Sequence, residues 1–188
     1  MAGIDEAGRG ALAGPVAAAA VILPARPLAW FDDVDDSKKL SAPERERLAK
    51  LILQDAAVGL AMSPASRIDS AGIATATREA MLAALNVLGS RVDGILVDGF
   101  ALPLPDDIPQ LALTRGDQVS ISVSAASIIA KVARDEVMRR LDNQHSGYGL
   151  ARNKGYGTPK HLAALRQIGP SPIHRRTFRN VEKVAEAS

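Results

Sequence analysis

Two adjacent carboxylates near the start of the chain, Asp5 and Glu6, stand directly before a glycine-rich loop in the segment GIDEAGRG (residues 3–10). Hard divalent cations such as Mg²⁺ prefer carboxylate oxygens, and glycines let backbone N–H groups approach an anion closely. Residues 2–4 are expected to end a buried strand. Because neighbouring side chains of a strand point to opposite faces, Asp5 and Glu6 can share an ion only if the strand ends or twists there. A charged, glycine-rich hairpin turn is the alternative.

Two further aspartates occupy positions where sites are often assembled. Asp98 closes a short apolar run, GILVDG (94–99), and Asp117 belongs to an Arg-Gly-Asp turn ahead of a long expected helix. Taken singly, Asp98 fits a turn residue and Asp117 a helix N-terminal flank. Together, Asp5, Glu6, Asp98 and Asp117 could hold two Mg²⁺ ions about 3.5–4 Å apart, which is an arrangement that hydrolyses phosphodiesters. Asp135 has basic residues at four-residue spacing and is instead expected in surface ion pairs.

Several other chemistries lack their signatures in this sequence. The chain has no cysteine, which excludes disulfides and thiolate metal sites. It contains no Ser–His–Asp signature, P-loop, dinucleotide-binding fingerprint or HExxH pair. His145, His161 and His174 lack zinc-ligand spacing and are expected to be surface or packing residues. The aspartate-rich loop 31–40 lacks the ligand spacing of a calcium loop and is expected to be solvated.

Apolar runs and helical periodicities predict the elements that must position the carboxylates. Strands are expected near residues 2–4, 15–23, 56–62, 94–99 and 111–113. Helices are expected after a capping box formed by Ser41 and Glu44, and over residues 76–88, 122–142 and 158–168. Strands that alternate with helices favour an α/β fold, in which sites form at the carboxyl ends of strands.

Composition and charge bound the class of protein. The 188 residues are 47% hydrophobic and 3% aromatic, which predicts one domain (1–188) with an aliphatic core. Residues 131–188 carry 12 Lys and Arg against 5 Asp and Glu, whereas residues 1–130 carry 11 against 16. A basic C-terminal third suits a polyanionic partner. No apolar run would span a bilayer and no signal-peptide pattern is present, so a cytoplasmic protein is expected.

The chain resembles the ribonuclease HII family, the type 2 ribonucleases H, over essentially its whole length. The matching segments are GIDEAGRGALAGPV (3–16), DSKKLS (36–41), ILVDG (95–99), RGD (115–117), SAASIIAKVARD (124–135), KGYGTPKHL (154–162) and HRRTF (174–178). The first and fifth of these segments are highly specific for the family.

The resemblance implies a ribonuclease H-like fold, with a central mixed β-sheet flanked by helices and a helical C-terminal part. It implies hydrolysis of the RNA strand of RNA–DNA hybrids, and nicking on the 5′ side of single ribonucleotides embedded in duplex DNA, leaving a 3′-OH and a 5′-phosphate. Asp5, Glu6, Asp98 and Asp117 would be the catalytic and metal-binding residues, with Mg²⁺ or Mn²⁺ in a two-metal site.

The resemblance also implies how the substrate is bound. Gly8, Arg9 and Gly10 would contact the ribose 2′-OH and neighbouring phosphates, and Tyr156 would stack on the deoxyribose 3′ of the junction. Lys39 and the basic residues of a C-terminal portion at about 143–188 would hold backbone phosphates. The implied setting is ribonucleotide excision repair by a monomer.

The chain departs from the family pattern at three places. It opens two residues ahead of Gly3, where the family usually has an N-terminal extension, and it has Gly72 and Asn153 where asparagine and histidine are common. Three alternatives stay open: a ribonuclease HIII, which would need an extra N-terminal domain not expected here, a catalytically inactive hybrid-binding module of the same fold, and a nuclease without a ribose requirement. Four intact, mutually repelling carboxylates argue against the binding module.

Overall fold

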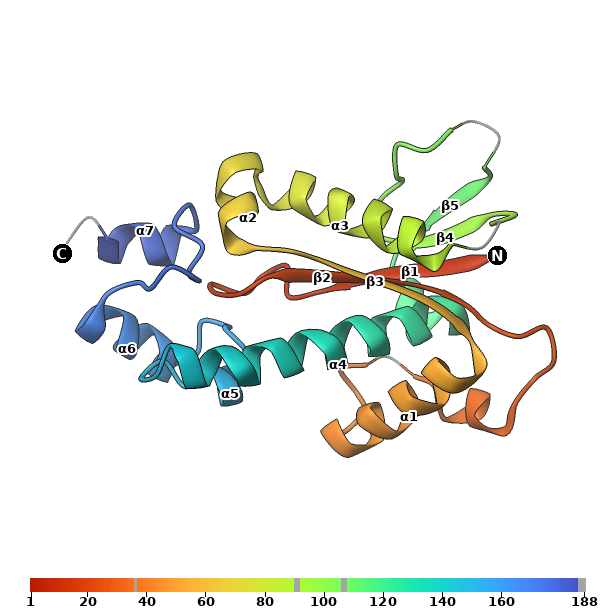
Figure 1. Ribbon diagram of the computed structural model, residues 1–188, viewed down its shortest axis with the longest axis horizontal. Coiled ribbons are helices and arrows are strands. Elements are labelled where there is room, and N and C mark those ends of the chain that lie inside the picture. The colour runs from red at the N-terminus through yellow and green to blue at the C-terminus, as the bar shows by residue number, and fades with distance from the viewer. Residues whose placement is uncertain (36, 90–91, 106–107, 186–188) are drawn as a thin grey trace.

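A computed structural model describes residues 1–35, 37–89, 92–105 and 108–185 of the chain (Figure 1). The strands are β1 (Ala2–Ala7), β2 (Val16–Ile22), β3 (Ala57–Ser63), β4 (Ile95–Asp98) and β5 (Gln110–Leu113). The helices are η1 (Ala29–Asp33), α1 (Ala42–Asp55), α2 (Ala65–Ala71), α3 (Ile73–Leu88), η2 (Gly116–Gln118), α4 (Ile121–Gln144), α5 (Leu150–Asn153), α6 (Pro159–Ile168) and α7 (Arg179–Ala185), with η marking 3₁₀ turns.

The five strands form one mixed sheet in the order β3-β2-β1-β4-β5. β1 pairs antiparallel with β2 and parallel with β4, while β2–β3 is antiparallel and β4–β5 parallel. β1 therefore lies at the centre of the sheet. The predicted α/β fold with a central mixed sheet is confirmed.

Helices cover both faces of the sheet, and β2 is therefore buried on both of its faces. Ala18 and Ala20 pack with α3 residues such as Met81, whereas Ala19 and Val21 pack with residues of α1 and α4. Figure 1 shows α3 on one side of the strands and α1 with α4 on the other. The continuous apolar run of β2 is what a strand buried on both faces requires.

Two local features of the sequence position helices against the strands. Ser41 and Glu44 form the predicted capping box at the start of α1. On β1, Gly3 lets α4 lie directly against the strand, because a Cβ there would come within 2.2 Å of the backbone carbon of Ser122. This close contact places α4 beside the carboxylates that follow Gly3.

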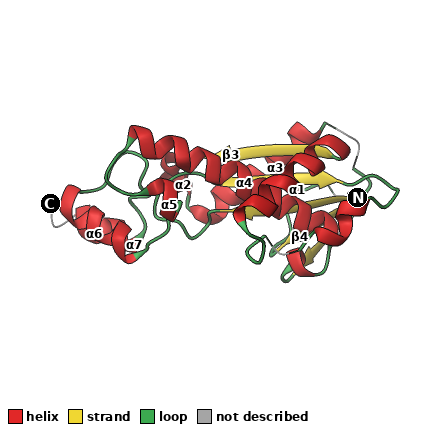
Figure 2. Cartoon of the chain, turned by 90° about the horizontal axis from the view of Figure 1, so that it is seen from below, coloured by secondary structure: helices red, strands yellow, loops and turns green. Residues whose placement is uncertain are grey.

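The C-terminal elements have a core of their own beyond one end of the sheet. α5, α6 and α7 gather there around an extension of α4 (Figure 2). Leu150, Leu165 and Val181 from these helices pack against Leu12 and Met138. The expected helical C-terminal part is therefore present, and it rests on the segment that follows the glycine-rich loop.

The sequence-based element limits need two corrections. The expectation that the first strand ends at Ile4 is wrong, since β1 continues through Glu6 to Ala7 while paired with β2. The short helix α2 is absent from the predicted elements, because it has seven residues and no side-chain cap at its start. In the expected solvated loop, Asp32, Asp33 and Asp35 are exposed, and Asp36 lies outside the described residues.

No helix in the described ranges is both long enough and apolar enough to cross a lipid bilayer.

Candidate active site

Strand pairing brings the first carboxylates together at the end of β4. Ile4 pairs with Val97 in the parallel β1–β4 ladder, and one residue further along each strand come Asp5 and Asp98. β4 ends at Asp98, so β1 lies beside no β4 residue past this point. The two aspartates are therefore neighbours where the parallel pairing stops, at the carboxyl ends of both strands.

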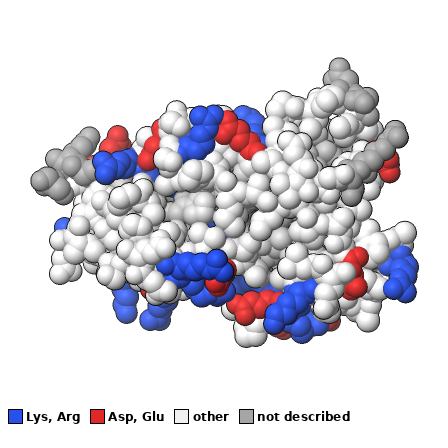
Figure 3. Space-filling view, viewed as in Figure 1, with Lys and Arg blue, Asp and Glu red and all other residues white. Residues whose placement is uncertain are grey.

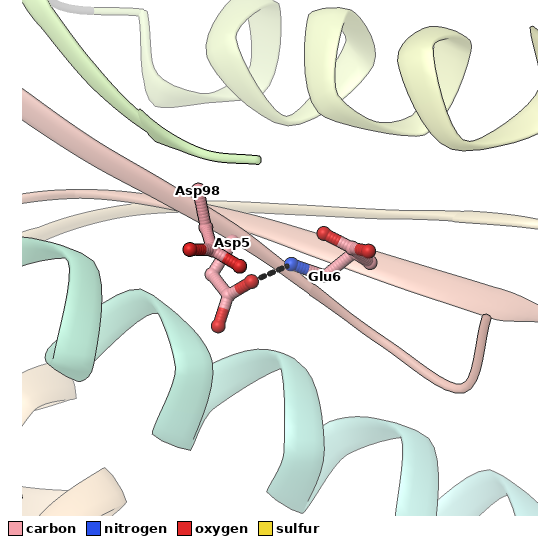
Figure 4. Close-up of side chains that lie close together, drawn as sticks. All are labelled: Asp5, Glu6 and Asp98. Carbon is pink, nitrogen blue, oxygen red and sulfur yellow. Dashed lines mark hydrogen bonds between the residues drawn. The ribbon is translucent and has the colours of Figure 1, made fainter. Parts of the chain in front are cut away.

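Asp5, Glu6 and Asp98 form one acidic cluster although β1 does not end between them. A carboxylate oxygen from each lies within 4.8 Å of the others, the only such acidic group among the residues described. Figure 4 shows Asp5 directed toward α4, with its Oδ1 accepting a 2.7 Å hydrogen bond from the Glu6 N–H. The Glu6 side chain is long enough to keep its carboxylate near the cluster from the neighbouring position.

The cluster is electrostatically costly without a cation. Asp5 is 4% exposed, and burial followed by the charge of Glu6 raises the pKa of its carboxyl well above the usual value. Burial also raises the pKa of Glu6, partly offset by Arg9. The three hard oxygen donors, closely spaced and short of positive partners, fit a divalent cation of the Mg²⁺ or Mn²⁺ type.

Asp117 lies in the adjoining turn, outside the group of three. It is 4% exposed and accepts a 3.1 Å hydrogen bond from Lys38 Nζ. The preceding residue, Gly116, donates its N–H to Asp98 Oδ1 at 2.6 Å, so the turn is tied to the cluster through the backbone. The structure thus brings three of the four predicted carboxylates together and holds the fourth beside them in an ion pair.

The acidic cluster opens into a pocket of about 490 Å³. Five parts of the chain meet around it: the end of β1 with its glycine-rich loop, the segment before α1, the end of β4, the middle of α4, and the loop after α5. Its lining includes the predicted residues Asp5, Glu6, Gly8, Arg9, Gly10, Asp98 and Tyr156.

Gly8 and Gly10 of this loop are glycines for different reasons. Gly8 has φ +89°, and a Cβ there would lie 1.8 Å from Arg134 Nε, so conformation and packing both require glycine. At Gly10 a Cβ would meet nothing within 4 Å, and φ is not positive. Neither property of the described fold demands glycine at position 10, which lines the pocket.

Tyr156 lines the pocket and is 37% exposed, and its backbone N–H donates to the Asn153 carbonyl at 2.9 Å. The guanidinium of Arg134 lies 5.5 Å from the ring centroid. His161 Nδ1 lies 2.9 Å from the Tyr156 carbonyl, which can only accept, so this nitrogen carries the proton.

His174 sets the orientation of the His161 ring through a hydrogen bond. His174 Nδ1 accepts the Ser171 N–H at 3.0 Å, so its proton is on Nε2, which donates to His161 Nε2 at 3.1 Å. Both rings are buried, as expected of packing residues.

The two departures from the family pattern have local structural roles. Gly72 has φ +82° and ψ 153° between α2 and α3, a conformation that is essentially restricted to glycine. Asn153 donates to the Tyr148 carbonyl at 2.7 Å and accepts the Gly155 N–H at 2.8 Å. Asn153 therefore shapes the loop that carries Tyr156.

The sequence analysis did not name several of the residues that line the pocket. One residue that it did name, Lys39, does not line the pocket. Lys38 lines the pocket, whereas Lys39 is exposed and donates to Asp35 at 3.0 Å. Ser37, Ser127 and Lys131 also line it, and a hydrogen bond from Ser127 supports the charged form of Asp5. These residues all lie in the motifs DSKKLS and SAASIIAKVARD, which were the available signal.

Asp135 pairs with Lys131 at 2.7 Å, as predicted. Arg139 instead bonds Glu136 at 2.9 Å and Glu46 at 3.3 Å.

A mixed sheet with helices on both faces and carboxylates at the end of its central strand defines a protein of the ribonuclease H-like fold. More specifically, the chain belongs to the ribonuclease HII family, whose model matches residues 2–181. It is accordingly an enzyme with ribonuclease H activity, directed at RNA–DNA hybrids.

Individual relatives agree with this assignment. The ribonuclease HII of Geobacter metallireducens is 51% identical over 184 residues, covering 97% of this chain and 85% of the relative. The crystal structure of the ribonuclease H2 from Pyrococcus horikoshii superposes with a TM-score of 0.83 at 28% identity, covering 99% and 97%. The ribonuclease HII from Archaeoglobus fulgidus, solved in complex with PCNA, superposes with a TM-score of 0.80 at 25% identity. The match covers 97% of this chain and 95% of that chain.

Proposed function

We propose that this enzyme hydrolyses the RNA strand of RNA–DNA hybrids and also nicks duplex DNA on the 5′ side of single embedded ribonucleotides. The products would be a 3′-OH and a 5′-phosphate. The reaction would use two divalent cations, Mg²⁺ or Mn²⁺.

One observation carries this proposal: the acidic cluster and the accessible glycine-rich loop line the same pocket. A Cβ at Gly10 would point into empty space, so the glycine leaves room for something outside the protein. A ribose 2′-OH and its phosphate are suitable occupants, because recognising RNA requires a contact to that hydroxyl. The carboxylates on the pocket floor would then lie beside the phosphodiester.

Within the proposal, Asp5, Glu6 and Asp98 hold the cations, and Asp117 is the fourth ligand. Bound divalent cations would supply Lewis-acid stabilisation of the attacking and leaving oxygens. Asp98 is oriented by the Gly116 N–H, and Asp5 by the Glu6 N–H. Lys38 bonds Asp117 through Oδ2, and its 78% exposed side chain has room to move, so this carboxylate can still offer an oxygen to a cation.

The substrate would lie across the pocket between two binding elements. Gly8, Arg9 and Gly10 would contact the ribonucleotide and its phosphates, and Tyr156 would stack on the sugar 3′ of it. Lys39 and the basic residues of positions 143–188 would contact the backbone electrostatically. On the face drawn in Figure 3, the Lys and Arg side chains along α1 and α4 alternate with Asp and Glu, and Arg139 pairs with Glu46 and Glu136.

The proposal includes the setting of the enzyme. Residues 1–188 would act as one domain and as a monomer in the cytoplasm, in the excision repair of ribonucleotides from DNA.

The test is strand cleavage with Mg²⁺ of a DNA duplex that carries one ribonucleotide, beside the same duplex without it. The Asp98→Asn variant keeps an acceptor for the Gly116 N–H but loses the charge, and should be at least about a hundredfold slower. The Asp32→Asn variant is the matched control, since Asp32 is exposed on η1, away from the pocket.

A single nick 5′ of the ribonucleotide, made by the native protein and by Asp32→Asn, supports the proposal. Binding of the duplex without a nick, with either Mg²⁺ or Mn²⁺, would favour a hybrid-binding module instead. Cleavage of the all-DNA duplex would indicate a nuclease without a ribose requirement.

A further inference from the structure

Two arginines buried behind the glycine-rich loop have no carboxylate partner. Arg134 on α4 and Arg175, just before α7, are both 0% exposed. Neither lies within ion-pair distance of an acidic side chain in the part of the chain that the structure describes. A buried charge without a counter-charge is costly. Their guanidinium groups must therefore be held by something other than ion pairs.

The two guanidinium groups bind backbone carbonyls from two separate segments. Arg134 donates to Pro15 at 2.8 Å, to Ala13 at 3.1 Å and to Lys154 at 2.9 Å. Arg175 donates from Nε to the Gly14 carbonyl at 3.0 Å and from Nη1 to the Arg9 carbonyl at 2.9 Å. The pair thus fastens the segment from Arg9 to Pro15 onto the loop that carries Tyr156.

The contact with Arg9 fixes the direction of the next amide. The described peptide bonds are trans, so the Arg9 carbonyl and the Gly10 N–H point in opposite directions. Arg175 is buried and draws the carbonyl inward, which turns the Gly10 N–H outward, at a residue that is exposed and lines the pocket. This N–H makes no backbone hydrogen bond to the described residues.

Arg134 holds the glycine-rich loop from the side that faces Tyr156. Its guanidinium lies 5.5 Å from the centre of the Tyr156 ring and directly under Gly8. A single side chain therefore contacts the loop at Gly8, the carbonyl of Lys154 and the ring of Tyr156.

Arg175 is held behind the loop at an electrostatic cost. Its Nη2 is buried without a hydrogen-bond partner among the described residues, and an unsatisfied buried donor costs about 1–3 kcal/mol. Burial, followed by the charge of Arg134, lowers the pKa of Arg175 to about 9, so the group is still charged at neutral pH. Arg175 thus makes its contacts with the Gly14 and Arg9 carbonyls in spite of this cost.

We propose that Arg134 and Arg175 are positioning residues that aim the Gly10 N–H at a substrate phosphate and set its distance from Tyr156. In this way they determine how well the enzyme fits a ribonucleotide junction. The inference rests on the proposed function, because it assumes that the loop and Tyr156 bind the junction.

The test compares Arg175→Met, which has similar length and no donors, with Arg175→Lys and the control Arg47→Met. Arg47 is an exposed arginine on α1 whose partner is Asp33. Each protein is assayed on the single-ribonucleotide duplex and on duplexes in which one phosphate next to the scissile phosphate, on either side of it, is a neutral methylphosphonate. The neutral group weakens the acceptor that the Gly10 N–H would use.

We expect Arg175→Met to lower kcat/KM on the normal duplex by about tenfold or more, because small misplacement of binding groups is expensive in catalysis. The decisive readout is the methylphosphonate penalty at the contacted phosphate. This penalty should be about tenfold in the native protein and in Arg47→Met. Arg175→Met has already lost the contact, so it should cleave the modified and the normal duplex at nearly the same rate.

Three results would overturn the inference. One is an Arg175→Met protein that is slow but keeps the full methylphosphonate penalty, as a merely structural residue would. Another is a native protein without a penalty at either flanking phosphate, a result that needs no variant to fold. The third is an Arg175→Met protein, folded by circular dichroism, with native rate and native penalty. Arg175→Lys, which keeps a donor for the Arg9 carbonyl, should retain part of the penalty. If the native protein does not cleave the normal duplex at all, the proposed function has failed first.

Discussion

Asp5 shows at the scale of one residue how the proposed cation site strains the fold that carries it. Its carboxylate is buried beside Glu6 and Asp98, and its pKa is raised mainly by that burial. A raised carboxyl pKa means that the charged form is less stable in the folded chain than in the unfolded one. At neutral pH the metal-free protein therefore loses stability by keeping this charge.

We predict that Asp5→Asn stabilises the metal-free protein while it abolishes cleavage. Removing the buried charge should raise the free energy of unfolding by about 1 kcal/mol, which urea denaturation in the presence of a chelator will measure. Addition of Mg²⁺ should stabilise the native protein more than the variant. A destabilised variant in chelator would show that the charge is already compensated within the protein.

Much of the site could be predicted residue by residue, because the carboxylates occur in short specific motifs. What the sequence could not supply was the pairing register that sets Asp98 beside Asp5, or the ion pair that separates Asp117 from them. It also could not distinguish Lys38 from Lys39, since adjacent residues differ only in the direction their side chains take.

At the scale of elements, the site depends on the contact between β1 and α4. Asp5 follows Gly3 on the strand, and Ser127, which supports the Asp5 carboxylate, lies on the helix. The position without a side chain allows the two elements to come this close. A Cβ at Gly3 would meet the backbone of Ser122 at 2.2 Å, and no change of rotamer relieves a clash with backbone.

We predict that Gly3→Ala lowers the free energy of unfolding by at least about 3 kcal/mol, at the upper end of what overpacking costs. Gly10→Ala is the matched control, because its added methyl group meets no neighbour within 4 Å. The control should keep native stability in urea denaturation while cleaving the single-ribonucleotide duplex more slowly. Equal stability of the two variants would mean that β1 and α4 can separate at little cost.

The strands and the long helices could be predicted from the sequence, and the short helices could not. β2 and α4 are specified by extended apolar patterns, which local packing reinforces. The helices α2 and α7 each have seven residues, too few for a clear period, and their helical form depends on tertiary contacts. The end of β1 was misplaced because pairing with β2 carries the strand past Glu6.

At the scale of the whole molecule, the C-terminal part is joined to the catalytic part through buried polar groups. His174 forms an isolated β-bridge with Ala13, and its ring is hydrogen-bonded to His161, which in turn holds the Tyr156 carbonyl. Burial, followed by the neighbouring His161, lowers the pKa of His174 from 6.5 to about 4. Protonating His161 on Nε2 would break its bond from His174, and protonating His174 on Nδ1 would break its bond from the Ser171 N–H.

We predict that this connection loses stability in mild acid. A histidine with a depressed folded-state pKa stabilises the fold fully above pH 6.5, and the contribution falls as the pH drops toward about 4. The full loss corresponds to about 3 kcal/mol at most. Thermal unfolding from pH 8 to pH 4 should show this decline in the native protein and in a His145→Gln control, and a shallower one in His174→Gln. Parallel curves for all three proteins would refute it.

The central claim is that the acidic cluster binds divalent cations that contact the scissile phosphate. The most direct measurement replaces each non-bridging oxygen of that phosphate in turn by sulfur and compares cleavage rates with Mg²⁺ and Mn²⁺. Sulfur binds the hard Mg²⁺ poorly and the softer Mn²⁺ better. We predict that one sulfur isomer is cleaved slowly with Mg²⁺ and recovers with Mn²⁺ in the native protein. Equal slowing with both metals, or an Asp98→Asn protein that cleaves like the native one, would contradict it.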